Sequence, residues 1–345
     1  MFVLSSEITI GKFKFTGVHE VRIRRSLHGL ADTAIITIPS IAKILRGGVA
    51  FPGTITTANQ FNDGDAVEIK LGYNGYLRSE FSGFVRHRSL QMPLEVHCEG
   101  YSWLLRRTSN ARFYKADKVK ALLEEAVSGL GPGNEIAVEC DLNLKLGKVN
   151  GDGDSSFDLL TNIKKYTDEC LTCFFVEPNK LWCGLLYTAW AKGEDALKAG
   201  TVKYSIGENV RRDQQLQVKH NENDRVEVRY SKKLPNGNVI AQRSDILKKH
   251  LRRHKKIINR VLVEGDLKAL ANEKAYQLNN LGFEGSLTGF LEPFALPGYN
   301  AQILDKRFPE HNGEYLVEST EVVFGMGGAR RIVELGPRKG FAKEL

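Results

Sequence analysis

The stretch HNGEYLVESTEVVFGMGGARRIVELG, from His311 to Gly336, has two runs rich in β-branched residues on either side of a glycine-rich turn. This pattern predicts two long strands joined as a hairpin. The stretch contains no side chains with the spacing of a metal site or of an activated nucleophile. Any such chemistry must therefore come from other segments.

Bulk composition is that of a folded protein with more than one domain. The chain has 345 residues, 42% of them hydrophobic and 26% charged, and this length favours two or three domains. No apolar run approaches the roughly 18 residues needed to cross a bilayer. The start MFVLSSEITIGKFKF lacks the features of a secretory signal. We therefore expect a protein that is made and folded in the cytoplasm.

Net charge and cysteine content bear on partners and compartment. The formal net charge of +8 permits a polyanionic partner such as nucleic acid. An odd number of cysteines without a secretory signal argues against a disulfide framework. The five cysteines are Cys98, Cys140, Cys170, Cys173 and Cys183.

Short strands with turn signals between them dominate the first third of the chain. VHEVRIRRSL, TAIITIPS and AVEIKLGY have the alternation or the β-branched content of strands, and Asp63-Gly64 marks a turn. Strands at such short intervals are typical of a β-barrel or a sandwich. We expect residues 1–108 to form a first antiparallel β-barrel.

Helical patterns appear in the middle of the chain. ADKVKALLEEAVSGLG predicts a helix with Asp117 as its N-cap and Gly129 as its stop. DSSFDLLTNIKKYTDEC predicts a second helix with a capping box of Ser155 and Asp158. LTCFFVEPNKLWCGLLY then predicts a hairpin. Residues 109–205 are therefore expected to form a small α/β domain.

The strand signal returns after this domain. DRVEVRYSKKLPNGNVIAQRS predicts a hairpin that turns at Asn236-Gly237, and KIINRVLVEG predicts another strand. A helix opened by Asp266 is expected near 266–281. Residues 206–345, which include the hairpin quoted first, are expected to form a second antiparallel β-barrel.

A faint internal repeat links the two strand-rich regions. NDGDAVEIKL, SGFVRHRS and LEVHCEG follow one another in the first, and LPGYNAQILD, NGEYLVESTEVVF and RRIVELG do so in the last. Each set has a glycine-containing turn, a strand, a strand led by glycine and a return strand, which favours two related barrels. The predicted fold class is mainly β, with an α+β domain in the middle.

Two segments resemble metal sites only in part. Cys170-x-x-Cys173 with Cys183 nearby offers one thiol pair and no histidine, whereas a structural zinc site needs four ligands. NGDGDSSFD begins like a calcium loop, but Ile163 stands where such a loop needs its twelfth-position glutamate. We predict that these cysteines are buried in the core, and we predict no metal and no cofactor.

Enzyme motifs are equally incomplete. His250 and His254 lie four apart without the glutamate of a metalloprotease motif, and no Gly-x-Ser-x-Gly elbow occurs. The glycine runs GLGPGN and GMGG lack the Gly-Lys-Ser/Thr of a phosphate-binding loop. We therefore predict no catalytic residues and no enzyme.

The segment KKHLRRHKK, residues 248–256, is the most unusual by composition. Such a run can neutralise phosphates without reading sequence, but it has no aromatic residue for stacking on bases. We expect it on a loop or short helix that projects from the second barrel, and both a protein contact and a nucleic-acid contact stay open. The candidate contact residues are Lys248, Lys249, Arg252, Arg253, Lys255 and Lys256.

Three segments together carry a resemblance to a known family. They are DAVEIKLGY…SGFVRHRS…LEVHCEGYSWLLRR, then SSFDLLTNIKKYTDECLTCFFVEPNKLWCG, then ALANEKAYQLNNLGFEGSLTGF…LPGYNAQILD…NGEYLVESTEVVFGMGGARRIVELG. On these segments the chain resembles the baseplate hub proteins of contractile-tailed phages, also called late control protein D. The same likeness extends to the domains that begin type VI secretion spike proteins.

The resemblance implies two tail-tube-like barrels in one chain and a ring of three chains. Six barrels would then match the six-fold tail tube above, and three-fold symmetry would match a trimeric spike below. No active site is needed for this role, so function would lie in surfaces. Transient DNA passage through the lumen and assembly into a virion or injection-device baseplate are also implied.

The sequence departs from the spike-fused relatives, because no spike domain follows the second barrel before Leu345. A separate spike protein is therefore expected. A nucleic-acid-binding protein that uses residues 248–256 is the alternative function. An enzyme attached to such a hub is a third interpretation.

Overall fold

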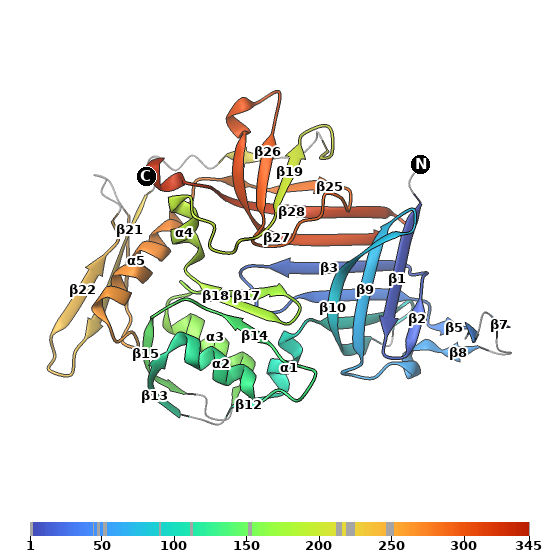
Figure 1. Cartoon of the computed structure of the whole chain (residues 1–345), viewed down its shortest axis with the longest axis horizontal. Helices are drawn as coiled ribbons and strands as arrows, with labels where there is room; N and C mark the ends of the chain where they lie inside the picture. Colours follow the sequence, from blue (N-terminus) through green and yellow to red (C-terminus); the bar gives the residue numbers. More distant parts are fainter. Residues whose placement is uncertain are drawn as a thin grey trace.

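The computed structural model describes residues 3–43, 45, 46, 49, 50, 54–89, 91–110, 113–150, 154–211, 216–218, 225–245 and 252–344. Strands predominate, and most helices gather on one side of the molecule (Figure 1). None of the helices in this described part is long and apolar enough to cross a membrane.

The first part of the chain is a series of strands with clear alternation. In β9, Val67, Ile69 and Leu71 are buried, whereas Glu68 and Lys70 lie on the opposite side. The β9–β10 turn has Asn74 and Gly75 at positive φ, 54° and 84°, as a two-residue type I′ loop requires. The elements are β1 (Leu4–Ile10), β2 (Phe13–Phe15), β3 (Glu20–Ser26), β4 (Thr33–Ile38), β5 (Ile41–Ala42), β6 (Leu45–Arg46), β7 (Val49–Ala50), β8 (Ile55–Thr56), η1 (Thr57–Gln60), β9 (Ala66–Tyr73), β10 (Tyr76–Ser89) and β11 (Leu94–Glu99).

The middle of the chain contains the expected helices and hairpin. The capping box of Ser155 and Asp158 is confirmed at the start of α3. The N-cap expected at Asp117 is wrong, because α2 starts later, with Lys118 in that position. The elements are α1 (Ser102–Arg107), β12 (Ser109–Asn110), β13 (Phe113–Lys118), α2 (Val119–Ser128), β14 (Ala137–Glu139), β15 (Lys145–Asn150), β16 (Asp154–Ser155), α3 (Ser156–Tyr166), β17 (Thr172–Glu177), β18 (Lys180–Gly184) and α4 (Leu186–Lys192).

The last part of the chain has one predicted strand in a different place. The segment KIINRVLVEG is mostly not a strand, because the strand β23 lies earlier and ends at Ile257. The helix expected near 266–281 is α5, which starts at Glu264 and ends at Leu278. The elements are β19 (Thr201–Ser205), β20 (Gln217–Val218), β21 (Val226–Lys233), β22 (Val239–Arg243), β23 (Arg252–Ile257), α5 (Glu264–Leu278), β24 (Phe283–Glu284), β25 (Ser286–Gly289), β26 (Asn300–Leu304), η2 (Pro309–His311), β27 (Gly313–Gly325), β28 (Gly328–Arg338) and η3 (Phe341–Glu344).

The two strand-rich regions belong to one sheet. Among the described residues, twelve strands form it in the order β19–β26–β27–β3–β4–β11–β10–β9–β1–β2, with β28 beside β27 and β25 beside β28. Strand β27 is the link, because it pairs with β26 over its first residues and with β3 over residues 319–325. Neighbouring strands are antiparallel except β19 and β26.

The hairpin β27–β28 contributes to two different cores, which explains its length. Near its tip, Val322, Phe324 and Ala329 pack with residues of the first region. Near its base, Tyr315 and Val317 pack with residues of the last region, together with Val333 and Leu335 of β28. The hairpin is therefore a wall that both halves of the sheet share (Figure 1).

A buried ion pair joins this hairpin to the first half. The Nη2 atom of Arg331 lies 2.6 Å from Oε1 of Glu80, and the two side chains are 2% and 3% exposed. Arg331 also donates to the carbonyls of Leu291 and Ala295. Burial raises the pKa of Glu80, and Arg331 opposes that rise.

A third core lies between the helices and the sheet β22–β21–β23. The predicted stripe of α2, which is Val119, Leu122, Leu123 and Ala126, is fully buried there. Residues of β21 and α5 complete the same core: Val228, Tyr230, Leu267, Leu270, Ala271 and Ala275. The limits 1–108, 109–205 and 206–345 stay a prediction, and this core shows packing across the second limit.

The fold class expected from the sequence is confirmed. The protein is mainly β, with an α+β region in the middle of the chain. Its two strand-rich halves each surround a core of their own. The sequence did not indicate that the halves are continuous through β27.

Candidate partner-contact surface

The basic run lies on an edge strand rather than on a projecting loop or helix. Lys248 and Lys249 fall outside the described residues, as does His250. The residues Arg252, Arg253, Lys255 and Lys256 are on β23, which pairs in parallel with β21. The expectation of a loop or short helix is therefore wrong for this part of the run. The reason is tertiary, because β21 supplies the backbone hydrogen bonds of the strand.

Strand alternation divides the run between two faces. His254 pairs with Val228, and Lys256 pairs with Tyr230. Val228 and Tyr230 are core residues. Arg253 pairs with Glu227, whose side chain is on the opposite face from that core. Consecutive cations of the run therefore have different surroundings.

The inner face of β23 binds Asp168. Nε2 of His254 lies 2.8 Å from Oδ2 of Asp168, and Lys256 forms an ion pair with Oδ1. The Tyr230 hydroxyl donates to Oδ2 over 2.8 Å, and Nζ of Lys274 donates to the Asp168 carbonyl over 3.0 Å. The Asp168 side chain is only 9% exposed. This contact ties the basic strand to the end of α3.

The hydrogen bonds around Asp168 favour its charged form. Burial on its own would raise the pKa of Asp168, but the hydrogen bonds from Lys256, His254 and Tyr230 outweigh burial and lower it. Asp168 has φ of 56°, a left-handed conformation that aspartate tolerates better than most residues. The carboxylate is thus an acceptor for several donors and has a structural role.

The outer face of the same sheet carries cations from all three strands. Arg229 of β21 stands opposite Arg243 of β22 and opposite Lys255 of β23. Next to this row, Nε of Arg253 lies 3.3 Å from Oε2 of Glu227. Arg229 and Arg243 were not among the residues predicted from the sequence. The alternation in VEVRYSKK and the Asn236-Gly237 turn could have placed them on one face.

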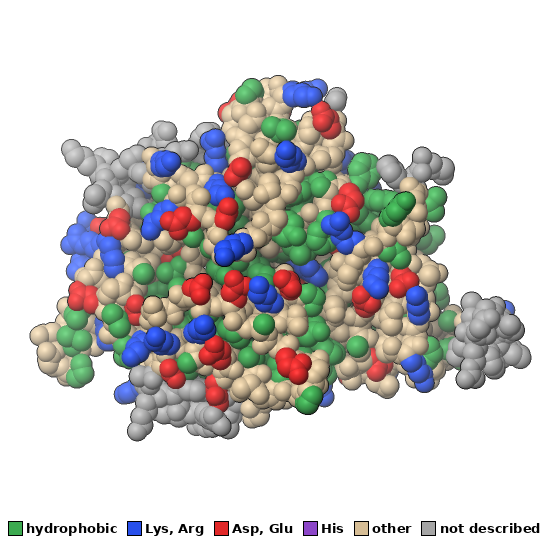
Figure 2. Space-filling view, viewed as in Figure 1, with side chains coloured by type: hydrophobic (Ala, Val, Ile, Leu, Met, Phe, Trp, Pro, Cys, Tyr) green, Lys and Arg blue, Asp and Glu red, His purple; other side chains and the backbone are tan. Residues whose placement is uncertain are grey.

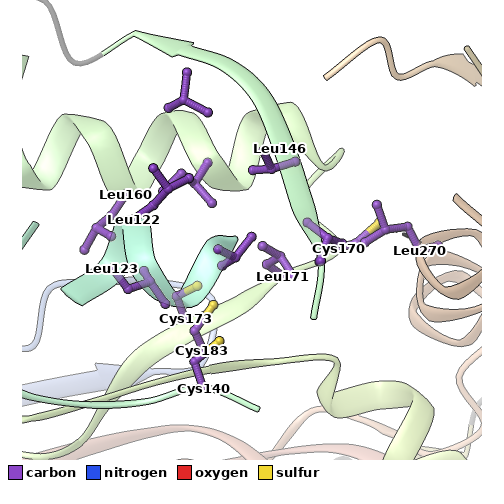
Figure 3. Close-up of a cluster of buried hydrophobic side chains, with 14 of the residues drawn as sticks. Leu122, Leu123, Cys140, Leu146, Leu160, Cys170, Leu171, Cys173, Cys183 and Leu270 are labelled. Carbon is purple, nitrogen blue, oxygen red and sulfur yellow. Dashed lines mark hydrogen bonds between the residues drawn. The ribbon is translucent and has the colours of Figure 1, made fainter. Parts of the chain in front are cut away.

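Cys170, Cys173 and Cys183 are buried, as predicted, and so are Cys98 and Cys140. All five are free, and Cys173 stands opposite Cys183 in the β17–β18 hairpin. Figure 3 shows Cys140 beside this pair, whereas Cys170 lies apart, toward Leu270. The spacing Cys170-x-x-Cys173 therefore does not bring those two thiols together. The described residues contain no group of three or more His, Cys, Asp or Glu side chains placed to hold a metal ion.

The thiols differ in their tendency to ionise. Burial raises the pKa of Cys170 to about 12, and its sulfur lies 3.4 Å from the Tyr230 hydroxyl. A hydrogen bond with Cys183 lowers the pKa of Cys140 to about 7. Cys140 is buried, however, and a reagent in solution has little access to it.

A polar cavity of about 420 Å³ lies where the sheet, α3 and α5 meet. Hydrogen bonds join some of its polar groups to one another. Tyr187 donates to Oε1 of Glu318 over 2.6 Å, and Lys164 donates to the His28 carbonyl over 3.0 Å. These contacts explain the cavity as a junction between parts of the fold.

Comparison with known proteins identifies the fold. No protein-family model matches the sequence, and no curated protein matches it. The tail protein from Neisseria meningitidis MC58 matches in structure with a TM-score of 0.63 and 12% identity, over 98% of this chain and 98% of that chain. The 43 kDa tail protein of prophage MuSo2 from Shewanella oneidensis matches with a TM-score of 0.64 and 12% identity, over 97% and 98%.

A secretion protein shares the same architecture. A component of the type VI secretion system of E. coli matches with a TM-score of 0.57 and 10% identity, over 96% of this chain and 76% of that chain. The resemblance expected from the sequence, to phage tail proteins and to type VI secretion proteins, is thereby confirmed in structure. The chain has the fold of these phage tail proteins.

Proposed function

We propose that the protein is a structural hub in the tail baseplate of a phage or of a related contractile injection device. The observation that carries this proposal is the match along almost the whole length of two tail proteins, which includes both halves of the sheet. The shared hairpin β27–β28 also supports it, because its residues pack into the cores of both halves and join them. Function then lies in surfaces and requires no catalytic residue.

In this proposal three copies form a ring. Each copy contributes its two strand-rich halves, so the ring of three copies has six similar units. These units contact a six-fold tail tube on one side. The three-fold symmetry of the ring fits a separate trimeric spike protein on the other side. The chain is made in the host cytoplasm and assembled into the baseplate, and DNA passes through the lumen of the ring.

The oligomeric mass of the purified full chain tests this function. Native mass spectrometry should detect trimers, alone or after addition of a spike protein, and electron micrographs should show rings with six lobes. A chain that stays monomeric with its spike, or a ring of another symmetry, would contradict the proposal.

The alternative is a nucleic-acid-binding protein that uses residues 248–256. Two residues of this run, His254 and Lys256, bind Asp168 and are not directed to an external phosphate. The structural-hub function therefore has more support.

A further inference from the structure

The outer face of the sheet β22–β21–β23 has an arrangement that does not favour folding. Arg243, Arg229 and Lys255 form a row across three neighbouring strands. Like charges directly opposite one another destabilise a sheet. In the described part of the chain, no ion pair or hydrogen bond joins these three side chains to an acidic group. We call this the cationic row.

Protection of sheet edges does not account for the cationic row. Charged side chains on edge strands prevent unwanted pairing with other sheets. That reason applies to Lys255 and Arg243, because β23 and β22 are the edges. It does not apply to Arg229, because β21 is the central strand. The central arginine therefore needs another explanation.

Apolar side chains lie next to the cationic row on the same face. Ser231 stands between Ala241 and Ile257, and Lys233 stands opposite Val239. Val239 is 58% exposed and Ile257 is 53% exposed. Figure 2 shows Lys and Arg side chains gathered at the left edge of the molecule, over β21 and β22. The face thus offers cations and apolar surface side by side.

We propose that this face binds a partner protein whose acidic side chains lie beside apolar ones. Arginine pairs with carboxylates in a planar, two-pronged geometry, and such a partner would also relieve the repulsion within the cationic row. Nucleic acid fits less well, because phosphates would not contact the apolar side chains of Val239 and Ile257 favourably. The described residues of this face also include no aromatic ring on which bases could stack. The inference does not depend on ring formation.

A synthetic amphipathic peptide with glutamate beside leucine is the probe, and its binding to the full chain is followed by fluorescence anisotropy. The combined change Arg229→Gln, Arg243→Gln and Lys255→Gln should weaken binding about tenfold, because it removes three charge contacts with the peptide. The matched control removes three exposed cations elsewhere and should change affinity less than about twofold. Its changes are Lys120→Gln, Lys203→Gln and Arg330→Gln.

A second variant separates a protein partner from nucleic acid. Val239→Ser with Ile257→Ser should weaken peptide binding several-fold and leave binding of a DNA duplex unchanged. Absence of peptide binding by the unaltered chain would overturn the proposal. Equal weakening of peptide binding by the control variant would also overturn it. So would DNA binding that is tighter than peptide binding and unaffected by the serine changes.

The second copy of the chain is a further candidate occupant. Sedimentation of the unaltered protein and of the glutamine variant decides this point. If the unaltered protein and the glutamine variant have the same mass in solution, the face binds a separate partner, whether or not the chain forms a trimer. Loss of an oligomer in the glutamine variant would assign the face to a second copy and overturn the proposal.

Discussion

The two faces of the sheet β22–β21–β23 both carry basic side chains, but in different surroundings. On the inner face, His254 and Lys256 bind the nearly buried carboxylate of Asp168. On the outer face, Arg229 and Lys255 stand opposite each other without such an acid in the described chain. The role of each cation therefore depends on whether its position in the strand is odd or even. The basic run therefore divides between an internal contact and an outward-facing surface.

The two faces should differ in how much their charged side chains contribute to the free energy of unfolding. Asp168 is shielded from water, so the charges that contact it are screened less than charges in solvent. Its partners are partly exposed, which limits the gain. We therefore expect changes at Asp168 to have large effects on stability and changes in the cationic row to have small ones.

The largest expected effect comes from Asp168→Asn. This change removes the charge and leaves Lys256 and His254 without their acid, so the free energy of unfolding should fall by about 2–3 kcal/mol. Urea unfolding of the full chain measures it. The control is Glu227→Gln on the outer face, which should change stability by less than about 1 kcal/mol. Equal losses of stability in the two variants would contradict the stronger contribution expected for the inner face.

Acid should remove the same contribution. The pKa of Asp168 is lowered from its ordinary value of 3.8, so the unfolded chain takes up the proton first as pH falls. The stabilisation is complete above the unfolded value and is lost as pH falls through the lower folded value. The stability difference between the unaltered chain and Asp168→Asn should therefore shrink as pH falls below 3.8. A difference that instead grew on acidification would contradict this assignment.

A smaller effect is expected from Tyr230→Phe. The change keeps the buried ring but removes the hydroxyl that donates to Asp168, which should lower stability by about 1–2 kcal/mol. Tyr204→Phe is the control, since the Tyr204 hydroxyl is buried and has no hydrogen-bond partner in the described structure. Thermal unfolding should show a loss for Tyr230→Phe and none for Tyr204→Phe. A loss of the same size in both would show that the bond to Asp168 is not the cause.

Local patterns in the sequence predicted many of the elements. The Asn236-Gly237 turn predicts the β21–β22 hairpin, and the capping box at Ser155 predicts the start of α3, because both depend on residues close in the chain. Alternation likewise predicts the long strands of the terminal hairpin. The double use of that hairpin could not be predicted, because it depends on distant strands.

The candidate surface was harder to predict than the fold. The run RRHKK of β23 has neither β-branched residues nor apolar alternation, so only its pairing with β21 makes it a strand. The acid that its inner face binds, Asp168, is 88 positions away from Lys256. Composition alone made the cations candidates for a contact surface, but their division between two faces required the structure.

The smallest expected effect is a gain in stability from Arg229→Thr. This change removes the central charge of the cationic row and introduces a β-branched residue, so stability should rise by about 0.5 kcal/mol. Arg253→Thr is the matched control, because Arg253 has Glu227 as its partner and its loss should bring no gain. Repeating both in about 1 M salt separates the two causes, since charge repulsion is screened there and strand propensity is not. A gain in stability for Arg229→Thr that becomes smaller in salt would show that charge repulsion in the cationic row destabilises the fold. A loss of stability in Arg229→Thr would mean that the arginine supports the sheet, and the reason for expecting a partner on the outer face would disappear.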